Sequence, residues 1–160
     1  MIYEFKRDPY MDQYAQFISF ACDHSDAVMM VFLTEKGNSK ENNSINNIRF
    51  HLSPWRIKSR HDPQWPVTIC KDKKTMCTID LYAPSAEIKS FLLSINHLFG
   101  WGTELPPTDI AFFQHNYCWI ATCSHEKYGW VKAEMPLPTN YLDYLSPVND
   151  PNDLTFFEEY

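Results

Sequence analysis

The sequence has few glycines, and its cysteines lack paired spacing. Only 4 glycines occur in 160 residues, without a GxGxxG or GxxxxGK pattern. This argues against a nucleotide-dependent enzyme, because such enzymes cradle phosphates in a glycine-rich loop. The 5 cysteines are odd in number and form no CxxC pair. We therefore expect reduced thiols rather than a disulfide framework.

Long apolar runs are also missing. No stretch reaches the roughly 20 apolar residues that a membrane helix needs, and the N-terminus MIYEFKRDP lacks the basic and then apolar order of a signal peptide. We therefore expect no membrane association and a cytoplasmic protein. Hydrophobic residues make up 44% and aromatic residues 16% of the chain, which is typical of a packed globular domain. Length and the lack of repeats predict a single domain, 1–160.

The segment 109–126, DIAFFQHNYCWIATCSHE, is the densest in aromatic and β-branched residues. An apolar run over 110–113 precedes Gln-His-Asn. Four side chains then follow at a spacing of two: Tyr117, Trp119, Ala121 and Cys123. This pattern predicts a central β-hairpin with one buried face that includes Trp119. At its far end, Ser124, His125 and Glu126 are three polar groups that could face a cleft.

The other patterns predict an α+β fold with a single mainly antiparallel sheet of five to seven strands and two packed helices. Helical spacing predicts helices at about 9–23, capped by Asp8, and from Ser85 to about 99, with Gly100 at the end. Apolar or alternating runs predict four further strands: 27–34, 48–52, 67–70 and 75–82. The first of these is expected to be covered on both faces. The aperiodic segment 35–47 predicts a surface loop.

Charge is distributed unevenly along the chain. The net charge is −6, and residues 1–132 contain equal numbers of acidic and basic side chains. From about residue 133 we expect an irregular acidic wrap, in which carboxylates steer a basic protein partner and tyrosines anchor it. The predicted partner-binding residues are Tyr141, Asp143, Tyr144, Asp150, Asp153, Glu158 and Glu159, with His125 and Glu126 as a second surface. Simple solubility is the alternative explanation of the acidic tail.

Two Cys-x-His pairs, Cys22 with His24 and Cys123 with His125, have a spacing that would let them converge on one zinc ion. Cys123, His125 and Glu126 also resemble a nucleophile, base and orienting group. However, neither a helix N-terminus nor a glycine turn lowers the pKa of that thiol. We therefore predict no catalytic residue, no metal and no cofactor, and keep a small thiol- or metal-dependent enzyme using Cys123 and His125 as the alternative.

The segment 49–65 is basic and rich in aromatic residues. Its relevant side chains are Arg49, Phe50, Trp55, Arg56, Lys58, Arg60 and Trp65. Basic and aromatic residues interleaved in this way are typical of a nucleic-acid groove. The acidic total and the sequence pI near 5.4 argue against that function. A nucleic-acid-binding module therefore stays a further alternative.

One set of short motifs resembles a known class of proteins. The motifs are Trp65-Pro66, Tyr82, Phe99-Gly-Trp101, Pro107-Thr-Asp109 and the run 119–126. They resemble small bacterial immunity-type proteins of polymorphic or contact-dependent inhibition toxin systems. The resemblance implies a protein that binds and neutralises a cognate toxin domain, often a nuclease, without catalysis. No catalytic residue follows from it, and neither the residues nor the resemblance defines an oligomeric state.

Overall fold

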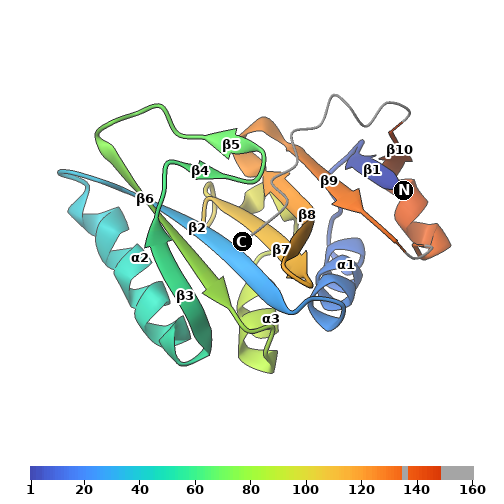
Figure 1. Ribbon diagram of the computed structural model, residues 1–160, viewed down its shortest axis with the longest axis horizontal. Helices are drawn as coiled ribbons and strands as arrows, with labels where there is room; N and C mark the ends of the chain where they lie inside the picture. The colour runs from blue at the N-terminus through green and yellow to red at the C-terminus, as the bar shows by residue number, and fades with distance from the viewer. Residues whose placement is uncertain (135–136, 149–160) are drawn as a thin grey trace.

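The computed structural model describes residues 1–134 and 137–148 (Figure 1). Its main sheet contains β1 (Ile2–Phe5), β2 (Ala27–Glu35), β3 (Arg56–His61), β6 (Thr75–Tyr82), β7 (Asp109–Gln114), β8 (Tyr117–Cys123), β9 (Tyr128–Lys132) and β10 (Leu145–Pro147). A small second sheet pairs β4 (Gln64–Trp65) with β5 (Thr68–Ile69). The helices are α1 (Asp12–Asp23), α2 (Ser39–Leu52) and α3 (Ala86–Leu92). None of these helices is long and apolar enough to cross a bilayer.

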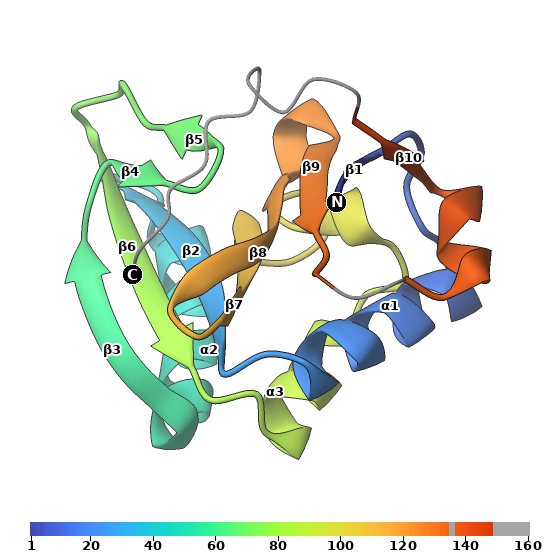
Figure 2. The same cartoon turned by 45° about the vertical axis from the view of Figure 1, so that its right-hand side comes forward.

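The main sheet is antiparallel throughout, in the order β10-β1-β9-β8-β7-β2-β6-β3. Figure 2 shows β1, β9 and β10 gathered at one end of this sheet and β3 at the other. The α+β class predicted from sequence is therefore confirmed. The prediction of a single sheet of five to seven strands with two helices is wrong, since the described residues form a main sheet of eight strands, a second sheet of two strands and three α-helices. Two of the missed strands, β1 and β10, are only 4 and 3 residues long, too short to show an alternating pattern.

The predicted hairpin is confirmed as β7 and β8, in the middle of the sheet. His115 and Asn116 form its turn with φ of 50° and 68°, which matches the type I′ turn that suits the twist of two adjacent strands. The predicted alternation is wrong in one detail. The pairing shifts between Phe112 and Phe113, so β8 carries one extra residue and Trp119 and Ile120 both face the same cluster.

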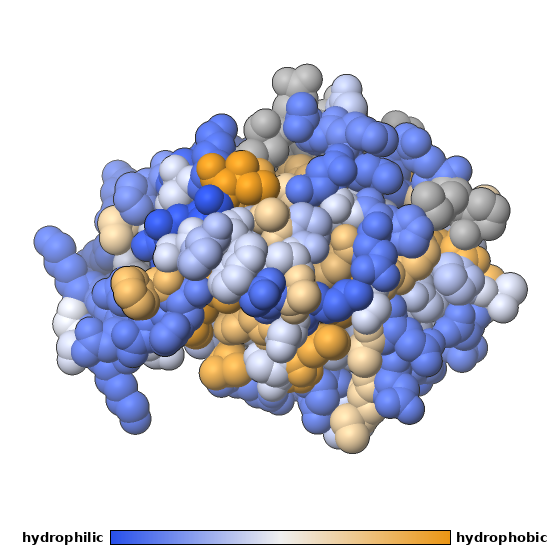
Figure 3. Space-filling view, turned by 90° about the horizontal axis from the view of Figure 1, so that it is seen from below, coloured by the Kyte–Doolittle hydropathy of each residue, from blue (hydrophilic) through white to orange (hydrophobic). Residues whose placement is uncertain are grey.

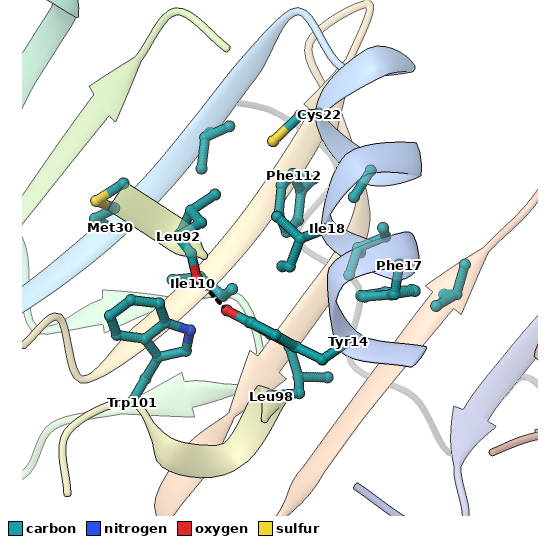
Figure 4. Packing of buried hydrophobic residues seen from close by; sticks show 14 of the residues in the cluster. Tyr14, Phe17, Ile18, Cys22, Met30, Leu92, Leu98, Trp101, Ile110 and Phe112 are labelled. Atoms are coloured by element: carbon teal, nitrogen blue, oxygen red, sulfur yellow. Dashed lines mark hydrogen bonds between the residues drawn. The ribbon is translucent and has the colours of Figure 1, made fainter. Parts of the chain in front are cut away.

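Both faces of the sheet are buried along its central strands. The helices cover one face, where α1 packs against α3 and β7 (Figure 4), and the Tyr14 hydroxyl donates to the Leu92 carbonyl oxygen at 2.5 Å. Trp65 and neighbouring residues cover the other face. Strand β2 alternates between the two, with Met30 in the first cluster and Met29 in the second. The expectation of a central strand covered on both faces is therefore confirmed.

Helix α2 corrects two predictions, the loop at 35–47 and the strand at 48–52. The Asn38 side chain accepts a hydrogen bond from the Glu41 N–H and caps the helix. Ile45 and Leu52, seven residues apart, are the buried positions of α2, whereas Phe50 is 75% exposed. The alternating pattern that indicated a strand therefore comes from a helix with a narrow buried stripe.

The ends of the other two helices are partly as predicted. Ser85 caps α3 by accepting from the Ile88 N–H at 3.2 Å, but α3 ends at Leu92 and Gly100 lies in a separate 3₁₀ turn. Asp8 does not cap α1, which begins at Asp12. The Asp8 carboxylate instead accepts hydrogen bonds from the backbone N–H groups of Leu98 and Phe99, at 2.8 and 3.2 Å.

His97 lies between the Asp8 carboxylate and a second carboxylate. The charge of the His97 ring should make the stability of the protein depend on pH. The two ring nitrogens of His97 lie 2.7 Å from Asp8 and 2.7 Å from Glu104. Burial lowers the pKa of His97, but the hydrogen bonds and charges of Asp8 and Glu104 outweigh it, and the net shift is upward from 6.5.

A raised pKa in the folded state means that the stabilisation is complete below 6.5 and disappears as the pH rises through the folded-state value. We expect His97→Gln to remove this pH dependence. Its size in the free energy of unfolding is about 0–1 kcal/mol, because the groups are partly exposed. Urea unfolding between pH 5 and 9 measures it. His51→Gln, an exposed site on α2, is the control. Equal pH dependence in the parent protein and His97→Gln would contradict the prediction.

Candidate functional site

The open end of the central hairpin brings three reactive side chains together. Ala111 pairs with Ala121, so two residues further along the strands Asp109 stands opposite Cys123. The chain turns after Cys123 and places His125 beside them. An Asp109 carboxylate oxygen, Cys123 Sγ and a His125 ring nitrogen all lie within 4.8 Å of one another. Sequence reasoning identified the last two residues but not Asp109.

Two residues of the small β4–β5 sheet, Trp65 and Thr68, contact this cluster. Trp65 Nε1 donates to Asp109 Oδ2 at 2.9 Å, and the Thr68 hydroxyl donates to Cys123 Sγ at 3.4 Å. The Ser124 N–H donates to the other carboxylate oxygen of Asp109 at 2.7 Å. The carboxylate and the thiol are therefore fixed in position by N–H and O–H donors from two separate parts of the chain.

Burial governs the chemistry of these groups. Asp109 is 0% and Cys123 1% exposed. Burial raises the pKa of Asp109 despite the opposing N–H donors of Ser124 and Trp65. Burial likewise raises the pKa of the Cys123 thiol. Because the thiolate is the nucleophile, Cys123 is poorly suited to attack a substrate at neutral pH.

His125 is the accessible member of the cluster. Its side chain is 61% exposed, and its Nδ1 lies 3.4 Å from Cys123 Sγ. On its other side, Nε2 lies 3.7 Å from a carboxylate oxygen of Glu126. His125 and Glu126 therefore lie at the surface directly beside the buried pair.

The second Cys-x-His pair does not join this cluster. Cys22 lies on the buried face of α1, and His24 Nδ1 lies 2.8 Å from the Phe20 carbonyl oxygen. Across residues 1–134 and 137–148, the one group of three potential metal ligands is Asp109, Cys123 and His125. The two Cys-x-His pairs, whose spacing would allow both to reach one zinc ion, therefore do not converge in the structure.

The structure places the two tail tyrosines inside the core, not on the surface as expected of partner anchors. Tyr141 is 3% and Tyr144 0% exposed. The Tyr144 ring stacks on Phe5, with centroids 6.4 Å apart, and the Tyr141 hydroxyl donates to the Gln16 carbonyl oxygen at 3.1 Å. Both rings attach the C-terminal segment to α1 and β1. Their apolar character, which suggested anchoring, reflects this internal packing.

The acidic residues of the predicted surface fall into two groups. Asp143 is exposed, and its carbonyl oxygen accepts from Arg7 Nε at 2.9 Å. The remaining four lie outside the described residues: Asp150, Asp153, Glu158 and Glu159. Their placement at a binding surface therefore stays a prediction.

The basic segment 49–65 contains ion pairs rather than a free row of cations. Arg49 donates two hydrogen bonds to the Asp80 carboxylate, at 2.6 and 3.0 Å. Arg56 lies 3.7 Å from the same carboxylate. Trp65 is buried and so offers no face for base stacking. Asp80, a single carboxylate in the otherwise apolar end of β6, was not identified from sequence. The sequence signal that could have identified Asp80 is a charged residue among apolar ones.

Exposed hydrophobic side chains are scattered over different elements, for example Phe50 on α2 and Ile57 on β3. Figure 3, a view from below, shows separated hydrophobic patches on a mostly hydrophilic surface. A hollow of about 540 Å³ lies between α1 and the segment 138–141. Phe20 and His24 line it on the α1 side.

Comparisons of the chain with protein-family models, with curated proteins and with solved structures give no match.

Proposed function

We propose that this protein binds and neutralises a basic protein partner, as an immunity protein neutralises a toxin domain, without catalysing a reaction. The observation that carries the proposal is the attachment of an acidic segment to one edge of the sheet. All the excess negative charge of the sequence follows Lys132. A nearby positive surface would be attracted to it over about 8 Å at physiological ionic strength.

The attachment is built from backbone pairing and aromatic packing. Strand β10 pairs with β1, and the Val148 N–H donates to the Ile2 carbonyl oxygen at 2.9 Å. Tyr144 precedes this strand and is buried. Residues 149–160 therefore follow a fixed point on the sheet, and they include four carboxylates and no Lys or Arg. Such a segment favours rapid encounter with a basic partner.

The alternative enzyme is less well supported, because its proposed nucleophile Cys123 is buried and has a raised pKa. A nucleic-acid groove is less well supported because Arg49 and Arg56 ion-pair with Asp80. His125 and Glu126 stay the second candidate contact surface for the partner, since both are exposed.

Neutralising the tail should slow association. The variant replaces Asp150, Asp153, Glu158 and Glu159 with their amides. Because long-range attraction sets the encounter rate, we expect the association rate constant at low salt to fall by roughly tenfold. Its dependence on ionic strength should flatten, whereas the dissociation rate constant should change little. The proposal expects a toxin gene beside this one, and biolayer interferometry against the C-terminal domain of that toxin, at several salt concentrations, measures both.

A matched variant separates position from total charge. It neutralises four exposed acidic residues elsewhere: Asp12, Glu35, Asp72 and Glu87. We expect this control to retain most of the parent association rate. If both variants associated like the parent protein, the tail would be a solubility feature. If the chain neither bound that domain nor protected cells from it, the proposed function itself would be wrong.

A further inference from the structure

The sheet contains two fully buried carboxylates, and only one has a cationic partner. Asp80 and Asp109 are both 0% exposed. Asp80 forms ion pairs with Arg49 and Arg56. Within the described part of the chain, no Lys or Arg forms an ion pair with Asp109. A buried carboxylate without an ion-paired Lys or Arg is costly, so the surroundings of Asp109 need a separate explanation.

Those surroundings consist of metal-ligand atoms. A thiol, an imidazole and a carboxylate are the three ligand types that zinc takes in proteins. In a tetrahedral site with bonds of about 2.0–2.3 Å, neighbouring ligand atoms lie about 3.3–3.8 Å apart. Cys123 Sγ and His125 Nδ1 are 3.4 Å apart, and all three ligand atoms lie within 4.8 Å. Small side-chain rotations would bring the Asp109 oxygen to a similar distance from the other two ligand atoms.

The groups around the ligands leave them free to bind. Each Asp109 oxygen accepts one N–H, from Trp65 or Ser124, and each still has a lone pair. The Thr68 hydroxyl orients the sulfur in the same way. Such outer hydrogen bonds are characteristic of metal sites, where they fix ligand orientation. The Ser124 hydroxyl, between the two ligands in sequence, is buried and has no hydrogen-bond partner in the described structure.

We propose that Asp109, Cys123 and His125 bind one zinc ion at the open end of the central hairpin. His125 is exposed, so the fourth position faces solvent and takes water, as in zinc sites with three protein ligands. The ion supplies the positive charge that the buried carboxylate lacks. It also joins the hairpin to the chain after β8. This site does not depend on the proposed partner binding.

Metal binding by the isolated chain tests the site directly. The protein is stripped with a chelator, and Zn²⁺ is titrated in competition with a chromophoric chelator. We expect one equivalent to bind and the melting temperature to rise with free zinc. Co²⁺ in place of zinc should give a sulfur-to-cobalt charge-transfer absorption band, because Cys123 is a ligand. No binding, or cobalt binding without this band, overturns the proposal.

Variants assign the binding to these residues. His125→Ala removes an exposed ligand, so it should fold normally and bind zinc at least about tenfold more weakly. His51→Ala, an exposed histidine on α2, should bind like the parent. Cys123→Ser should abolish the charge-transfer band. If Cys123→Ser fails to fold, His125→Ala still decides, because unchanged zinc affinity in that variant places the metal elsewhere and overturns the site.

Discussion

Replacing Trp119 with alanine is expected to lower the free energy of unfolding by about 3–5 kcal/mol, as for other large aromatic side chains in a core. The indole is 8% exposed and lies edge-on to the Phe20 ring, with centroids 6.0 Å apart. Its Nε1–H donates to the Ser25 hydroxyl at 2.9 Å. Alanine therefore leaves a cavity between β8 and α1 and also removes this hydrogen bond.

Urea unfolding measures this loss, and two further variants test its cause. Trp119→Phe keeps most of the apolar contact and should lose less stability than Trp119→Ala. Tyr117→Ala, at an exposed position of the same strand, should change stability by about 0.5 kcal/mol or less. If Trp119→Ala unfolded at the parent urea concentration, the hairpin would not contribute to the core as described.

The hairpin could be predicted from sequence because local signals agree there. The apolar run, the turn residues and the alternation all fall within 109–126, and a two-residue turn fixes the pairing. The extra residue at Trp119 could not be predicted in this way. A bulge is set by contacts across the sheet, and both Trp119 and Ile120 pack toward the helices.

The same bulge explains why Asp109 was missed. Without the register shift after Phe112, Asp109 would stand opposite Thr122, whose side chain points to the same face in a regular ladder. The shift brings Cys123 opposite it instead. A one-residue change in register therefore decides which side chain meets the carboxylate. Spacing along one strand could identify Cys123 and His125, but not their third partner.

Helix α2 shows a different limit. Ile48, Phe50 and Leu52 alternate with polar residues and resemble a strand over that short window. The helix start was readable, because Asn38 precedes Glu41 by three residues and its side chain accepts from the Glu41 N–H. Longer-range periodicity through Ile45 would have favoured the helix. The buried stripe is narrow because much of α2 faces solvent.

The ion pairs of Asp80 could not be predicted from sequence, because they join residues from three separate elements. Asp80 lies on β6, while Arg49 comes from α2 and Arg56 from β3. The sequence separation between these residues hides the cluster, so the arginines were interpreted as a basic surface. In the structure they neutralise a buried charge, and the Tyr82 hydroxyl donates to the same carboxylate at 2.9 Å.

Replacing Asp80 with alanine is therefore expected to cost about 3–5 kcal/mol, because removing one partner of a buried ion pair leaves the other uncompensated. Here Arg49 and the Tyr82 hydroxyl would lose their acceptor, and Arg56 would lose its ion-pair partner. Urea unfolding measures the change. Asp62→Ala is the control, since the Arg60–Asp62 pair is partly exposed on both sides and should contribute about 0–1 kcal/mol.

The pH dependence of the Asp80 variant tests the charge itself. Burial raises the pKa of Asp80, but the hydrogen bonds from Arg49, Ser59 and Tyr82 and the charge of Arg49 outweigh it and hold the pKa below 3.8. A lowered pKa means that the stabilisation is present above the unfolded-state value and is lost as the pH falls through the folded-state value. Asp80→Asn should therefore lose less stability than the parent between pH 5 and pH 2. An equal acid-induced loss in both proteins would mean that Asp80 is not the carboxylate whose charge the arginines require.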